Sequence, residues 1–204
     1  MMERGGACGV IEWGWAGRAL EGTSGDCHAV VPFAGGALAA LIDGLGHGTE
    51  AAAAAGAALP VLERTAGAPL VEVLDACHAE LRRTRGAVMT LASFDARSAS
   101  LSWIGVGNVD GTVFRAARDA ARDEALPLRG GVVGFRLPSL QVRAIRIWPG
   151  DLLVMVTDGI RSAYSSALPR ELPPQELAET IVARYASGSD DAHVLVARYL
   201  GEAP

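Results

Sequence analysis

The chain has no long apolar run and no block of basic residues, and each absence removes a class of protein. Half of its 204 residues are hydrophobic, but Gly, Asp or Pro interrupts every apolar stretch well before the roughly 18 residues that a membrane span needs. The 18 basic residues are outnumbered by 23 acidic ones, and their densest cluster is Arg82, Arg83 and Arg85. We therefore expect neither a membrane nor a nucleic acid as partner.

Cysteine is also scarce, and no two cysteines have the CxxC spacing of a metal or redox site. Cys8, Cys27 and Cys77 are an odd number, and the start MMERGGACG lacks a basic region followed by an apolar one. These features predict free thiols in a cytoplasmic protein. Cys27 adjoins Asp26, but we interpret it as a small buried hydrophobe rather than a metal ligand.

Predicted strands and helices come in blocks rather than in strict alternation. Helices are expected at residues 49–64, 69–85 and 173–188, and Pro60 predicts a kink or break in the first. Strands are expected at residues 9–15, 26–33, 36–43, 88–95, 98–106, 109–115, 140–148, 152–158 and 193–200, with a polar excursion at 116–130. This order favours an α+β fold of mostly antiparallel sheets flanked by helices. Without repeats or linkers, the length predicts a single domain over residues 1–204.

Aspartates lie at the ends of four predicted strands, each beside Gly, Ser or another Asp. They are Asp26 in SGDC, Asp43 in IDGLGHG, Asp158 in VTDGI, and Asp190 with Asp191 in GSDDAHVLV. Clustered carboxylates repel one another unless a divalent cation joins them, and all-oxygen ligation suits Mg²⁺ or Mn²⁺ better than zinc. Aspartate also favours turns, so one motif alone would show little. The four together predict a site where two ions activate water to attack a phosphoryl group.

In this order, the motifs resemble the PPM-type (protein phosphatase 2C-like) serine/threonine phosphatases of the bacterial SpoIIE/RsbU branch, and among them the short RsbX type. The resemblance rests on SGD at 24–26, DGLGHG at 43–48, GNV at 107–109, GVVG at 131–134, TDGI at 157–160 and DDAHVLV at 190–196. It implies a layered α/β/β/α sandwich with a metal site at one edge between the two sheets.

The resemblance also implies the metal shell. Asp43 would bridge two Mn²⁺ or Mg²⁺ ions, Gly44 would offer its carbonyl, and the remaining ligands would be Asp26, Asp158 and Asp190. The same aspartates would be the catalytic residues, because they hold the ions that activate the water.

Other residues near the motifs keep two interpretations each. His47 can protonate the leaving serine oxygen, or it can orient water or backbone at a helix start. Arg18 can clamp phosphate or be solvated, and Asn108 can bind phosphate or shape a turn. Asp191 is expected to neighbour the ligand rather than be one. His193 stands where the family often has Thr, so a hydroxyl contact there is lost or replaced.

As substrates, the resemblance implies phosphorylated STAS-domain proteins of a stressosome, dephosphorylated by a monomer. Three alternatives remain: a phosphatase of an anti-anti-sigma factor, a metal-dependent phosphoesterase of small molecules, and a non-catalytic binding module. A binding module would be expected to lack one of the metal aspartates, and none is missing. Residues 159–189 leave little room for a large substrate-binding flap.

Overall fold

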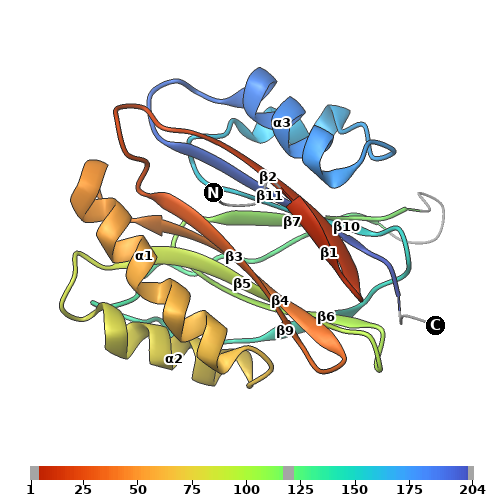
Figure 1. Cartoon of the computed structure of the whole chain (residues 1–204), viewed down its shortest axis with the longest axis horizontal. Coiled ribbons are helices and arrows are strands. Elements are labelled where there is room, and N and C mark those ends of the chain that lie inside the picture. The colour runs from red at the N-terminus through yellow and green to blue at the C-terminus, as the bar shows by residue number, and fades with distance from the viewer. Residues whose placement is uncertain (1–4, 117–121, 202–204) are drawn as a thin grey trace.

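The computed structural model describes residues 5–116 and 122–201, and this part of the chain folds into two antiparallel sheets flanked by helices (Figure 1). One sheet contains, in spatial order, β1 (Gly5–Cys8), β2 (Ile11–Arg18), β11 (Ala192–Tyr199), β10 (Leu152–Val156), β7 (Asp110–Phe114) and β8 (Glu124–Ala125). The other contains β3 (Asp26–Phe33), β4 (Gly36–Gly44), β5 (Ala87–Asp95), β6 (Ser100–Val106) and β9 (Arg143–Arg146). Of the predicted excursion at 116–130, residues 117–121 lie outside the described residues.

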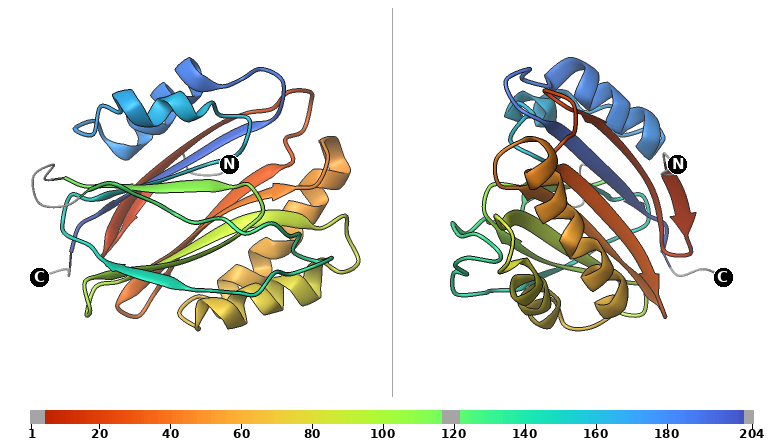
Figure 2. Two further views of the ribbon diagram at one scale, coloured as in Figure 1. Left: turned by 180° about the vertical axis from the view of Figure 1, so that it is seen from behind. Right: turned by 60° about the vertical axis from the view of Figure 1, so that its left-hand side comes forward.

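Helices form the two outer layers. α1 (Gly48–Thr65) and α2 (Leu70–Leu81) pack on the five-stranded sheet, and α3 (Pro174–Tyr185) with the 3-10 helix η1 (Ser162–Ala167) packs on the six-stranded sheet (Figure 2). The layers run helix, sheet, sheet, helix, which confirms the predicted α/β/β/α sandwich. Within the described residues, no helix is long and apolar enough to cross a membrane.

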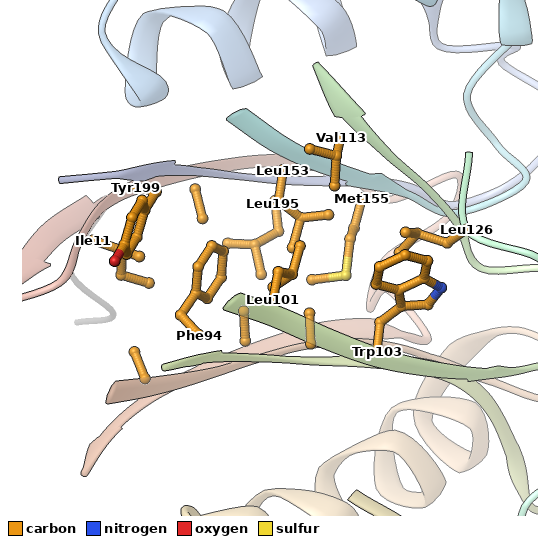
Figure 3. Packing of buried hydrophobic residues seen from close by; sticks show 14 of the residues in the cluster. Ile11, Phe94, Leu101, Trp103, Val113, Leu126, Leu153, Met155, Leu195 and Tyr199 are labelled. Carbon is orange, nitrogen blue, oxygen red and sulfur yellow. The ribbon is translucent and has the colours of Figure 1, made fainter. Parts of the chain in front are cut away.

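The inner faces of the two sheets meet around an apolar core (Figure 3). Phe94, Leu101 and Trp103 from the five-stranded sheet pack against Met155 and Leu195 from the six-stranded one. Side chains alternate along each strand, so every second residue points into this layer. The core fixes the spacing of the two sheets, and with it the position of the residues at the strand ends.

β4 lies between two apolar layers. Ala37 and Ala39 face the core between the sheets, whereas Leu38 and Ile42 face α1 and α2. A strand that is buried on both faces has a continuous apolar sequence, as predicted for residues 36–43. The small side chains of Ala37 and Ala39 let the other sheet lie close to β4.

Three expectations need correction. The strand predicted at 9–15 is part of a hairpin, because Gly9 turns the chain at φ +58° between β1 and β2. The first helix runs unbroken through Pro60, which is exposed, so water can satisfy the carbonyl that the proline leaves without a donor. The strand predicted at 140–148 shortens to β9, a mostly exposed edge strand that pairs only with the first half of β6.

Candidate metal centre

The predicted aspartates lie at strand ends on the same edge of the sandwich. Asp26 begins β3 and is the register partner of Asp43 near the end of β4. In the other sheet, Asp158 follows the end of β10, while Asp190 and Asp191 directly precede β11, the antiparallel neighbour of β10. Each sheet thus supplies its acidic residues from two adjacent strands.

Hydrogen bonds join the two sheets at this edge. The Thr157 hydroxyl, from the end of β10, donates to a carboxylate oxygen of Asp26 at 2.8 Å. The two carboxylate oxygens of Asp191 accept the backbone N–H groups of Leu20, at 2.7 Å, and of Gly25, at 2.6 Å. These bonds hold the loop that crosses from β2 to β3, and so fix where Asp26 enters the edge.

Two of the glycines beside the aspartates permit a close approach of backbone. A Cβ atom on Gly44 would lie 2.0 Å from the carbonyl oxygen of Ala51 in α1. A Cβ atom on Gly159 would lie 1.9 Å from the carbonyl oxygen of Asp191. The Asp-Gly pairs therefore let α1 and the start of β11 pack directly against the acidic edge.

Burial, and then repulsion by neighbouring carboxylates, make Asp26 and Asp43 difficult to ionise without a cation. Burial raises the pKa of Asp26 to about 7, although the hydrogen bond from Thr157 opposes the rise. Burial and then the charge of Asp26 raise the pKa of Asp43 to about 8. Within the described residues, none of the ion pairs involves an aspartate of this edge. Without a cation these two carboxyls therefore retain protons near neutral pH, and a divalent cation would favour their ionised forms.

Asp158 and Asp190 are the exposed members of the group. Burial, and next the charge of Asp190, raise the pKa of Asp158, while Asn108 lowers it by donating its side-chain N–H at 2.7 Å. Asp190 accepts the backbone N–H of Asp191 at 2.8 Å. In the described residues, no three Asp, Glu, His or Cys side chains already enclose a point where an ion would sit.

The sequence left two interpretations each for Asn108, His47 and Arg18, and the structure places all three at or near this edge. Asn108 contacts Asp158 and so acts on a carboxylate of the edge. Exposed His47 is the backbone N-cap of α1, with no capping hydrogen bond from its side chain. Arg18, also exposed, ends β2 opposite Ala192.

His193 is buried, two residues after Asp191 along the chain. Its contact with His28 was not predicted from the sequence. Its Nε2 lies 2.9 Å from Nδ1 of His28, and its ring stacks on Trp15 with centroids 5.1 Å apart. Burial lowers the pKa of His28 to about 4 and that of His193 to about 3, so both rings are neutral at pH 7. The sequence does contain a signal for this contact. Side chains two residues apart in a strand point to the same face, and each histidine follows an aspartate of the edge by two residues.

Comparison with known proteins supplies a family. Residues 34–200 match the family model described as stage II sporulation protein E (SpoIIE). A search of curated proteins finds no match.

Solved structures similar to this chain cover almost all of it. One, with 33% identity and a TM-score of 0.83, comes from work on the bacterial stressosome, a modular system adapted to control secondary messenger signalling; the similarity covers 92% of this chain and 99% of that one. RsbX in complex with magnesium has a TM-score of 0.84 at 16% identity, over 96% of this chain and 98% of its own. The PP2C phosphatase domain of SpoIIE from Bacillus subtilis, solved with a fragment of its regulatory domain, has a TM-score of 0.76 at 22% identity, over 95% and 63%.

Proposed function

Because this chain belongs to the SpoIIE family of PP2C-type phosphatases, we propose that it is a metal-dependent enzyme that removes phosphate from serine or threonine of another protein. The observation that carries the proposal is the acidic edge, where two sheets bring carboxylates together without a basic partner among the described residues. Such an arrangement is costly for a fold unless cations occupy it.

The donor set fits hard divalent ions. Asp43 would bridge two ions, with Gly44 contributing its carbonyl and Asp26, Asp158 and Asp190 completing the shell. All of these donors are oxygens, which Mg²⁺ and Mn²⁺ prefer. The carboxylates would rotate inward on binding, since rotation about side-chain bonds leaves the strand ends in place. When bound, the ions supply a water of lowered pKa and polarise the phosphoryl group.

The other residues of the edge hold this machinery in place. Thr157 fixes one oxygen of Asp26 and leaves the second free for an ion. Asn108 holds one oxygen of Asp158, and Asp191 anchors the loop before Asp26. His47, exposed in the loop that follows Asp43, is the candidate proton donor to the leaving oxygen.

For the substrate, we propose phosphorylated STAS-domain proteins of a stressosome. The 33% identical chain comes from stressosome work, and its similarity extends over nearly the full length of both chains. The exposed positions of Asp158 and Asp190 suit a phosphorylated residue on a folded surface better than a small molecule enclosed in a pocket. An anti-anti-sigma factor has the same chemistry and is the second candidate.

The test compares specificity constants. With Mn²⁺ present, the protein would be given phosphorylated stressosome STAS proteins, a phosphorylated anti-anti-sigma factor and a panel of nucleotides. We expect the highest kcat/KM for a stressosome protein. A nucleotide hydrolysed faster than every phosphoprotein would refute the proposal, and a preference for the anti-anti-sigma factor would change the substrate but keep the activity.

A further inference from the structure

A phenylalanine lies almost completely in solvent at the tip of a tight turn. The Phe135 side chain is 83% exposed, the highest exposure of any large hydrophobic residue in the described part of the chain. Its turn, residues 132–136, is closed by a pair of backbone hydrogen bonds between Val132 and Arg136, of 2.9 and 2.8 Å. Single exposed apolar residues are common on protein surfaces, but this ring stands out, because the next most exposed large hydrophobic residue in the described part of the chain, Trp148, is 45% exposed.

The exposure does not arise from a loose segment, because the two residues before Phe135 are bonded to β5 and to α2. Val133 is completely buried and exchanges two backbone hydrogen bonds with Ala87, of 2.8 and 3.0 Å. Gly134, at φ +96°, donates its N–H to Nδ1 of His78 in α2 at 2.9 Å. The ring is therefore presented on a rigid support.

The turn lies beside the acidic edge. Val133 bridges to Ala87, which is the register partner of Gly44, the residue after Asp43. Neighbouring strands are about 4.8 Å apart, so the backbone of the turn is about 10 Å from Gly44 across the sheet. A second bond ties the chain after Asp43 to the residue before Ala87: the N–H of Leu45 donates to the Gly86 carbonyl at 3.1 Å. In Figure 1 this is the left end of the sandwich, where β4 ends and α1 begins.

The charge on this flank is opposite to that of the edge. Its exposed arginines lie in the segment after α2 and in the stretch around the turn: Arg82, Arg83, Arg129 and Arg136, together with Arg85, which forms an ion pair with Glu50. A protein with a net charge of −5 thus has a basic flank beside its acidic site. Such a flank attracts an acidic partner, and guanidinium groups suit carboxylates and phosphates in particular.

We propose that the Phe135 turn is the docking contact for the protein substrate, with the Phe135 ring entering an apolar depression on the folded phosphoprotein and the arginines facing its acidic surface. A rigid aromatic side chain gives a large contact area and loses little conformational entropy on binding. A phosphorylated residue of the bound protein can then lie at the acidic edge, because Gly44 is about 10 Å from the backbone of the turn. This inference rests on the proposed function and adds the way in which the substrate is selected.

Docking and chemistry can be separated by the size of the substrate. A small aryl phosphate reaches the acidic edge without touching the Phe135 turn, whereas a folded phosphoprotein must cover it. Phe135→Ala should therefore affect only the protein substrate. Trp148→Ala is the matched control, because Trp148 is a 45% exposed aromatic residue that follows β9, at the other end of the sheet from Ala87.

The experiment uses the phosphoprotein that the wild type hydrolyses fastest, and an aryl phosphate, both with Mn²⁺. For Phe135→Ala we expect kcat/KM on the phosphoprotein to fall roughly tenfold or more, mainly through KM, as for loss of an interface anchor. Hydrolysis of the aryl phosphate should stay within about twofold of wild type, Phe135→Tyr should restore most of the loss, and Trp148→Ala should change neither substrate.

Three results would overturn the inference. Equal kcat/KM on the phosphoprotein for wild type and Phe135→Ala would show that the ring does not dock the substrate. Equal losses on both substrates would place the effect in the fold or the metal edge. A wild-type dimer that Phe135→Ala dissociates in size-exclusion chromatography would show that the ring binds a second copy. If the wild type hydrolyses no phosphoprotein, the proposed function itself fails and the docking role falls with it.

Discussion

Thr157, just after β10 in one sheet, donates a 2.8 Å hydrogen bond to a carboxylate oxygen of Asp26, the first residue of β3 in the other sheet. The same hydroxyl oxygen accepts the backbone N–H of His193 at 2.9 Å. A hydroxyl has one proton to donate, so the bond from His193 fixes its direction toward Asp26. One oxygen of a proposed metal ligand is thereby held in place from across the sandwich.

The first prediction follows from this bond. Thr157→Val removes the donor to Asp26 and should weaken Mn²⁺ binding by about 10- to 100-fold, the usual effect of losing a residue that orients a ligand. Calorimetric titration measures the affinity. Thr157→Ser keeps the hydroxyl and should bind within a few-fold of wild type. If the Ser and Val variants lost equal affinity, the methyl group and not the hydrogen bond would be responsible.

Asp43 and Asp191 should differ in what they do for stability. Asp191→Asn places an amide NH₂ against one of two backbone N–H donors, which should cost about 1–3 kcal/mol. At about 2–4 °C per kcal/mol, the Tm should fall by several degrees. Asp43→Asn removes a partly buried charge that its neighbours repel, so the Tm at pH 8 without metal should not fall. Thermal unfolding in chelator tests both, and a lower Tm for Asp43→Asn would contradict the interpretation.

The metal-free protein should lose stability as the pH rises from 6.5 to 8.5. The folded pKa values of Asp26, about 7, and Asp43, about 8, exceed the ordinary value of 3.8, so the folded state holds protons that the unfolded state has released. The stabilisation from these protons is lost as the pH passes through 7 to 8. The lowered pKa values of His28 and His193 have the opposite effect, but only below about pH 6.5.

Thermal unfolding over this pH range measures the effect. The Tm of the metal-free wild type should fall, whereas that of an Asp26→Asn, Asp43→Asn double variant should stay nearly constant. Adding Mn²⁺ should raise the wild-type Tm more at pH 8.5 than at pH 6.5, because the carboxylates must be deprotonated to bind it. A wild-type Tm that does not change between these pH values would contradict the raised pKa values.

The apolar strands could be predicted from the sequence because burial on both faces gives a continuous hydrophobic run. This holds for β4, expected at 36–43, and for β10, expected at 152–158. The β1–β2 hairpin was missed because its first strand, GGAC, has no apolar pattern. Local sequence patterns also do not show which sheet a strand joins. β2 and β3 follow one another in the chain but belong to different sheets.

The acidic edge could be predicted in part. Asp26 and Asp43 carry a local signal, an aspartate beside glycine at a strand end, and they become register partners. Thr157 carries no such signal, since its contact with Asp26 joins residues 131 positions apart and depends on how the two sheets face each other. The exposed Phe135 was equally hidden, because its sequence GVVGFR does not reveal which side chains the turn buries.

The most direct measurement is the hydrolysis of an aryl phosphate before and after removal of metal. In excess chelator, hydrolysis by the wild type should fall to background, and added Mn²⁺ or Mg²⁺ should restore it, because the proposed nucleophile is a water that the ions would activate. Asp43→Asn, with its fold checked by thermal unfolding, should stay at background at every metal concentration. Hydrolysis that persists undiminished in excess chelator, or an Asp43→Asn variant as active as wild type, would contradict a metal-dependent phosphatase at this edge.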